Sequence, residues 1–169
     1  MRAQKQRTTP VSGFTVVEMI TVLLLLGVLS AVAISRMVGT SAYEAALLRD
    51  FVASQTAHAR RHATFRQDVN ILLTLTRTAA GLTAVVSGGA EILHRDEWQS
   101  DARIDVAGTE LITGESLLVG YGGSGYLRTV VLRGAALPHA SGIAIAAIGE
   151  QLLDLCLHPS GVSRGGQCV

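Results

Sequence analysis

One charged residue, Glu18, lies near the start of an otherwise apolar stretch, residues 13–34. A carboxylate at the centre of a membrane helix costs roughly 2.5–3.5 kcal/mol, so an acid in such a stretch requires a cationic partner. Proteolysis between Gly13 and Phe14 would supply one, because it exposes a new α-amino group at Phe14. That amine could pair with Glu18 of its own helix or of a neighbouring copy. Pairing between copies would neutralise the carboxylate only upon assembly.

Two cysteines, Cys156 and Cys168, offer a second kind of chemistry. In an exported domain, a cysteine pair at this spacing is expected to form a disulfide. The bridge would close a short loop and contribute ~3 kcal/mol of stability. Two independent thiols are the alternative.

Other patterns resemble functional motifs but lack the context that their chemistry needs. Residues 120–125 match GxGxxG, but a dinucleotide site requires a helix after the glycines, and residues 126–133 have the pattern of a strand. We therefore expect a loop or turn there. Residues 94–96 match a kinase tripeptide without the other kinase elements. No Ser-His-Asp or Cys-His arrangement can be inferred, so we predict that the protein is not an enzyme and has no cofactor.

Candidate metal ligands occur in two places, and neither pattern predicts a site. His58 and His62 are four residues apart in a predicted helix, but the intervening glutamate of a zinc motif is missing. An acidic cluster in the second half of the chain has a spacing that fits no calcium loop. We expect it to be a solvated connection and to bind no metal; it consists of Asp96, Glu97, Asp101 and Asp105.

A local basic patch consists of Arg60, Arg61 and Arg66 together with His58 and His62. Such a patch could contact the phosphates of DNA. We expect it instead to pair with acidic residues of another subunit or to face solvent.

The elements that position these residues begin with a long helix. Residues 14–34 extend about 30 Å as a helix, the thickness of the hydrocarbon core of a bilayer, so this segment is expected to span a membrane. Residues 41–63 are rich in helix formers and contain neither glycine nor proline. We expect one helix of about 50 residues from Phe14 to near Phe65, with flexibility only at Gly39. An apolar stripe that could pack on a sheet comprises Tyr43, Leu47, Leu48, Phe51 and Val52.

From residue 68 the pattern changes to alternation, which predicts strands. Residues 69–76 and 82–86 flank a turn at 78–81 and form a predicted hairpin. Residues 91–101 are expected to form a polar connection or a short helix. A helix followed by strands predicts an α+β fold, with a long N-terminal helix packed on a C-terminal antiparallel sheet. The other predicted strands are 102–106, 110–113, 116–119, 127–133, 142–148 and 151–158.

The charge distribution predicts which end of the chain stays in the cytoplasm, but it does not indicate a binding partner. The 169-residue chain has a formal net charge of +1. Arg2, Lys5 and Arg7 give residues 1–13 a charge of +3 with no acid, which leaves 1 − 3 = −2 for the remainder. Basic residues before an apolar segment keep that end in the cytoplasm, so the C-terminal domain is expected to be exported. We do not expect nucleic acid as a partner.

The basic leader ending at Gly13, followed by Phe14-Thr15-Val16-Val17-Glu18 and an unbroken apolar run, closely resembles the N-terminal signature of type IV pilins and type II secretion pseudopilins. The resemblance implies that a prepilin peptidase cleaves after Gly13 and methylates Phe14, and that Glu18 supports subunit docking. Ser35 stands where many family members have proline, so no proline kink is expected. Residues 142–161 look like the closing hairpin of H-type pseudopilins and related minor pilins. Residues 36–63 look like minor pilins of mannose-sensitive haemagglutinin-type pili, so the system stays open.

These expectations define a pilin-like organisation: a cleaved leader (1–13), a transmembrane and filament-core helix (14–34), its amphipathic continuation (35–66) and an exported β-rich domain (67–169). The protein would cross the inner membrane once, with its C-terminal domain in the periplasm, and then join a type IV pilus or a type II secretion pseudopilus as a minor subunit. The implied partners are the prepilin peptidase, other pilin or pseudopilin subunits, the inner-membrane assembly platform and the membrane. Two alternatives stay open: a soluble secreted or periplasmic binding protein cleaved after Ala33, and a DNA-binding minor pilin for DNA uptake.

Overall fold

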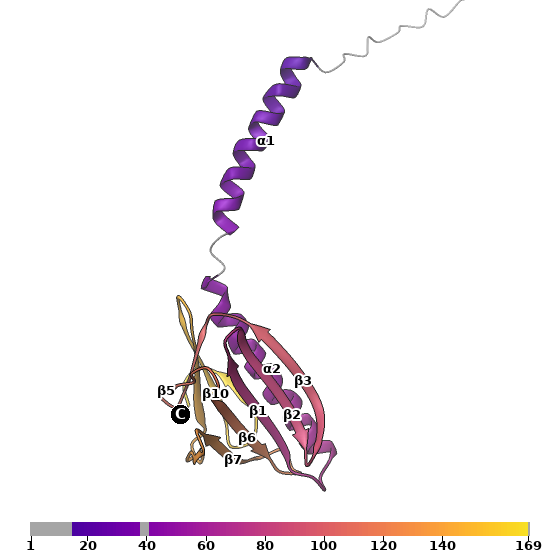
Figure 1. Ribbon diagram of the computed structural model, residues 1–169, viewed down its shortest axis with the longest axis vertical. Coiled ribbons are helices and arrows are strands. Elements are labelled where there is room, and N and C mark those ends of the chain that lie inside the picture. Colours follow the sequence, from indigo (N-terminus) through magenta and orange to yellow (C-terminus); the bar gives the residue numbers. More distant parts are fainter. Residues whose placement is uncertain (1–14, 38–40, 169) are drawn as a thin grey trace, which may run out of the picture. The chain divides into compact units, whose positions relative to one another are not determined.

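The computed structural model describes residues 15–37 and 41–168. The chain divides into two units, Met1–Gly39 and Thr40–Val169. The first unit contains helix α1 (Val16–Met37), and the second contains helix α2 (Ser41–Phe65) and all the strands (Figure 1).

Helix α1 begins directly after Thr15, which caps it. The Glu18 N–H donates to the Thr15 carbonyl oxygen at 3.0 Å and lies 3.3 Å from the Thr15 hydroxyl oxygen. This is the usual way in which a threonine satisfies a free N–H at a helix start. Glu18 lies in the first turn, where its negative charge is favourable for the helix dipole.

The predicted single helix of about 50 residues is wrong, because the structure has two separate helices. Gly39 lies in the sequence between them, and glycine costs about 1 kcal/mol in a helix interior relative to alanine. The strands were expected to pack on the C-terminal half of that helix, and α2, which covers this half, belongs to the same unit as the strands and contacts them.

Among the described residues, neither helix combines the length and the apolar character needed to cross a membrane. The expected membrane-spanning segment, and with it the single-pass location in the inner membrane with a periplasmic domain, is contradicted by this finding.

Helix α2 buries one face along its whole length. The buried positions recur with the period of one side of a helix and are Ala45, Leu48, Val52, Gln55, Thr56, Ala59 and Ala63. The predicted stripe was rotated from this face: Leu48 and Val52 are buried, but Tyr43 and Leu47 are exposed. Small alanines bring the α2 backbone close to the strands beneath it.

The strands form two antiparallel sheets rather than the single sheet that we expected. Sheet A has the order β3-β2-β1-β6-β7-β8, and sheet B has the order β11-β10-β9-β4-β5. The bounds are β1 (Ile71–Thr78), β2 (Gly81–Gly88), β3 (Glu91–Gln99), β4 (Arg103–Val106), β5 (Thr109–Glu110), β6 (Ser116–Tyr121), β7 (Leu127–Leu132), β8 (Ala135–Ala136), β9 (Ile143–Ile148), β10 (Leu152–Leu157) and β11 (Ser163–Gly165).

One hydrophobic core joins both sheets to α2. Helix α2 contacts β1, β2 and β6 of sheet A and β9, β10 and β11 of sheet B. Alternate residues of β1, β4 and β9 face this core: for example, Ile71, Leu73 and Leu75 of β1 are fully buried. The core thus holds the C-terminal hairpin and the first strands against the same helix.

The predicted hairpin of β1 and β2 is confirmed, with Ala79 and Ala80 as the connection. Residues 91–99, predicted as a polar connection, are instead the edge strand β3. The inward face of β3 carries His94, Asp96 and Trp98, so the apolar alternation that marks a strand is missing. The short strands β8 and β11 were also not predicted.

Candidate functional site

The predicted assembly residue Glu18 is exposed on α1. Its backbone carbonyl accepts a hydrogen bond from the Thr21 hydroxyl at 2.9 Å. Gly13 and Phe14, the predicted cleavage and methylation residues, lie outside the described residues. The structure therefore places the carboxylate on an accessible helix surface and leaves its proposed amine partner undescribed.

The surface of α1 around Glu18 is apolar. Its large exposed side chains are Val16, Val17, Met19, Ile20, Val22, Leu23, Leu24, Leu25, Leu26, Val28 and Leu29, each between 45% and 75% exposed. Soluble proteins rarely expose a contiguous apolar surface of this kind unless it contacts another molecule. The helix can pack against other apolar helices, with one carboxylate to fix their relative positions.

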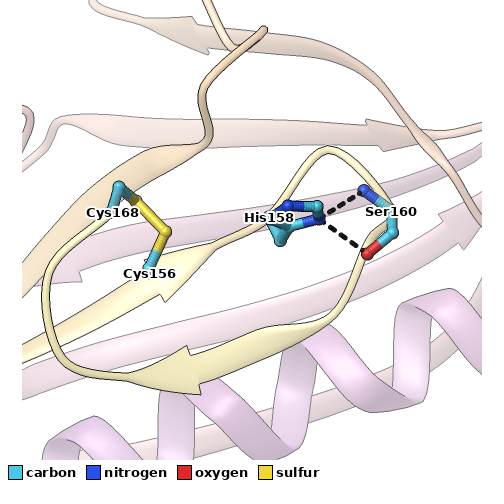
Figure 2. The surroundings of a disulfide bond; sticks show 4 residues. All are labelled: Cys156, His158, Ser160 and Cys168. Carbon is cyan, nitrogen blue, oxygen red and sulfur yellow. Dashed lines mark hydrogen bonds between the residues drawn. A yellow bond between two sulfur atoms is a disulfide. The ribbon is translucent and has the colours of Figure 1, made fainter.

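The predicted disulfide between Cys156 and Cys168 is present (Figure 2). Cys156 lies in β10 opposite Arg164 of β11, and Cys168 follows β11. A Cβ built on Gly142 would lie 3.0 Å from the Cys156 sulfur and 3.1 Å from the Cys168 sulfur, so the bridge packs on the residue just before β9. The bridge thus fixes the segment after β11 to β10 of sheet B.

His158 and Ser160 form the turn between β10 and β11 (Figure 2). The Ser160 N–H donates to His158 Nδ1 at 3.3 Å, and the Ser160 hydroxyl lies 2.9 Å from the same nitrogen. The Gly161 N–H donates to the His158 carbonyl at 2.8 Å, as in a β-turn with Pro159 at its second position. Since one ring nitrogen faces both groups of the turn, this serine–histidine pair is a turn contact rather than a catalytic dyad.

The glycines at 120–125 pack closely against their surroundings. A Cβ on Gly123 would lie 2.6 Å from the Gln67 carbonyl oxygen, and one on Gly125 would lie 2.9 Å from the Thr64 hydroxyl. The strand β7 follows directly, as predicted. These glycines let the loop approach the C-terminal end of α2, and no helix follows them to receive a phosphate.

The edge strand β3 pairs with α2 through three successive side-chain contacts. The rings of Phe51 and Trp98 lie 6.0 Å apart, the Gln55 Nε2 donates to Asp96 at 2.9 Å, and the His58 and His94 rings stack at 5.1 Å. Because these positions run in opposite directions along the two elements, β3 lies antiparallel to α2. An ion pair of 2.7 Å between Arg66 and Glu91 continues the series.

The predicted histidine, acidic and basic clusters are divided by the fold. His58 stacks on His94, while Asp96 and Glu97 lie on β3 of sheet A and Asp105 lies on β4 of sheet B. No group of three potential metal ligands occurs within the described part of the chain. Arg66 forms an ion pair with Glu91, which neutralises the charge that Arg66 was expected to contribute to the basic patch.

Tyr121 is fully buried, and its hydroxyl has no hydrogen-bond partner among the described residues. Burial raises the pKa of this phenol above its ordinary value, although the nearby positive charge of Arg60 opposes the rise. The group therefore stays neutral at physiological pH and serves packing rather than proton transfer.

We expect the stability of the wild-type protein to fall above about pH 10, because the unfolded chain then releases the Tyr121 proton while the folded chain retains it. The slope from this residue reaches about 1.4 kcal/mol per pH unit. Tyr121→Phe should remove that part of the dependence and leave stability at pH 7 nearly unchanged, since it deletes an unpaired hydroxyl. Urea unfolding of both proteins at pH 7 and across pH 9–11 measures the difference; parallel curves would contradict the prediction.

A cavity of about 410 Å³ lies on sheet A. It is lined by Asn70, Ile71, Leu72, Ser87, Gly89, Gly120, Tyr121, Arg128 and Thr129. Arg128 is the only charged residue of the lining, so the cavity holds no pair of groups for acid–base chemistry.

Comparisons of this chain with protein-family models, with curated proteins and with solved structures found no match.

Proposed function

We propose that this chain is a minor pilin or pseudopilin subunit that is processed after Gly13 and assembles into a filament through α1. The observation that carries the proposal is the largely apolar surface of α1, on which the exposed Glu18 is the one charged group among the described side chains. The signature around Gly13 and Phe14, which resembles that of prepilins, supports it from the sequence. The partners in this proposal are a prepilin peptidase and other subunits of the filament.

In the assembled filament, α1 packs against the corresponding helices of other subunits, and burial of its leucine and valine side chains stabilises the contact. Glu18 would then lose its water, so it needs the Phe14 amine of a neighbouring subunit as its partner. In this proposal the β-rich unit with its disulfide forms the outer surface of the filament.

The N-terminus of the mature protein tests the processing step. Mass spectrometry of protein recovered from the producing cells is expected to show a chain that starts at a methylated Phe14. A chain that starts at Ile34 would contradict the proposal and favour a secreted binding protein instead.

Glu18→Gln tests the assembly step. We expect normal cleavage but at least about a tenfold loss of the protein from sheared filaments, equivalent to 1.4 kcal/mol, because the amide cannot pair with the amine as a charge. Quantitative immunoblotting of the filament fraction measures the effect. Glu110→Gln, which neutralises an exposed carboxylate in the β-rich unit, is the matched control. Equal incorporation of both variants would remove the proposed role of Glu18.

A further inference from the structure

A groove at the C-terminal end of α2 combines arginines with exposed aromatic side chains. Ala57, Arg60, Arg61, Thr64 and Phe65 line this basic–aromatic groove, which has a volume of about 340 Å³. Phe65 is 80% exposed. Neither arginine forms an ion pair with any described residue. Aromatic residues and arginine are the types enriched at the centres of protein interfaces.

A second exposed aromatic residue lies close to this groove. Tyr126 is 57% exposed and directly follows Gly125, whose Cβ position lies 3.3 Å from the Arg60 Cγ. The loop at 120–125 thus brings Tyr126 beside the end of α2. Arg60, Arg61 and Phe65 thus line the groove, and Tyr126 directly follows the loop that packs on Arg60.

The opposite end of α2 carries the complementary charge. A groove of about 360 Å³ there is lined by Glu44, Asp101, Ala102, Arg103, Ile148, Gly149 and Glu150. The lining contains three carboxylates and one guanidinium group, and Ile148 with the neighbouring exposed Leu152 supplies apolar surface. Glu44 precedes Arg60 by 16 residues, which places the two grooves about 24 Å apart along the helix.

We propose that the basic–aromatic groove of one copy binds the acidic groove of a second copy of this chain, so that the β-rich units stack head to tail. The proposal rests on the proposed function as a filament subunit and names a contact between subunits outside α1. Arg60 and Arg61 face Glu44 and Asp101 of the next copy, and Phe65 and Tyr126 cover Ile148 and Leu152. Since the two surfaces differ and lie at opposite ends, the contact leaves both ends open and generates a row of copies.

Engineered cysteines in the full chain test the contact directly. Ala57→Cys lies in the basic–aromatic groove and Gly149→Cys in the acidic groove, and neither change removes a charge. With a short bis-maleimide linker, a chain carrying both cysteines is expected to form a ladder of cross-linked copies on a denaturing gel. Each single cysteine is expected to give no species larger than a dimer. No ladder from the doubly substituted chain would overturn the proposal.

Charge reversal in the chain with both engineered cysteines distinguishes a specific charge pair between copies from the effect of any change in charge. Arg61→Glu is expected to reduce the ladder at least about tenfold, because it faces the acidic groove with a like charge. Adding Glu44→Arg to the same chain should restore the ladder. Arg128→Glu, an equal charge change at an exposed position of β7, should leave it unchanged. A ladder that persists with Arg61→Glu, or that Glu44→Arg does not restore, would overturn the proposal.

Binding of a fluorescent single-stranded oligonucleotide distinguishes a second explanation, since arginines with exposed aromatic rings also bind nucleic acid. We expect no binding that depends on Arg61. Tight binding that is lost in Arg61→Glu, without recovery of the ladder by Glu44→Arg, would assign the groove to nucleic acid. Mass spectrometry of the same sample keeps the two proposals apart: a methylated Phe14 without a ladder contradicts only the head-to-tail contact.

Discussion

Gly161→Ala is expected to destabilise the β-rich unit by roughly 2–5 kcal/mol. Gly161 has a φ of +78°, a left-handed conformation that costs other residues about 1–2 kcal/mol. A Cβ at this position would also overlap the Gly125 carbonyl oxygen and lie 3.2 Å from the Tyr121 ring. The turn between β10 and β11 would have to move away from both α2 and the loop at 120–125.

The loss of contact should extend beyond the turn, because the neighbouring Pro159 carbonyl accepts the Leu127 N–H at 2.9 Å and so links this turn to β7 of sheet A. Urea unfolding followed by circular dichroism measures the effect. Gly114→Ala is the matched control: Gly114 has a φ of +89°, but nothing lies within 4 Å of its Cβ position. That variant should lose only about 1–2 kcal/mol. Equal losses of stability in the two variants would show that the close approach of Gly161 to Gly125 does not contribute to the destabilisation.

Replacing both Cys156 and Cys168 by alanine is expected to lower the stability of the β-rich unit by ~3 kcal/mol. The bridge joins residues 12 apart and restricts the unfolded chain by closing that loop. Alanine is chosen because Cys156 is buried and a serine hydroxyl there would lack a partner.

Thermal unfolding with and without a reductant measures this effect. The wild-type protein should shift towards the midpoint of the double variant when the reductant is added, and the double variant should not respond. If the wild-type midpoint were the same in both conditions, the bridge would not contribute to stability.

The sequence predicted the strands that alternate cleanly between apolar and polar residues. In β1, Ile71, Leu73 and Leu75 recur with a period of two, and all three face the core. In β3 the inward positions are His94, Asp96 and Trp98, whose partners Phe51, Gln55 and His58 come from a helix 40 residues earlier. Because the residues of β3 that contact α2 are polar or aromatic and pair with residues far away in the sequence, the local pattern of β3 does not predict a strand.

The division into two helices and two sheets was harder to predict for a similar reason. The residues of α2 favour a helix wherever they are placed, so the sequence could not show that this helix is separate from α1. The buried face of α2 consists largely of alanine, threonine and glutamine, which carry little apolar signal. Larger residues at Tyr43 and Leu47 therefore shifted the predicted stripe towards a face that is in fact exposed.

The candidate sites divide in the same way. Two cysteines in one short segment allow a single bridge, and the bridge is present. The arginines of the basic–aromatic groove could be recognised in the sequence as part of a basic patch, but the packing of the loop at 120–125 on Arg60 could not, because that contact is made through Gly125. Residue spacing along the sequence does not predict a contact that forms because a tight glycine loop folds against a helix.

The sharing of α2 between sheets has a consequence for biosynthesis. A ribosome produces this helix before any of the strands that cover it, and β9, β10 and β11 follow all the strands of sheet A. Until these three strands emerge, the buried face of α2 lacks their contacts and is open to chaperones. Folding of the unit therefore cannot finish while the nascent chain is still growing through these strands.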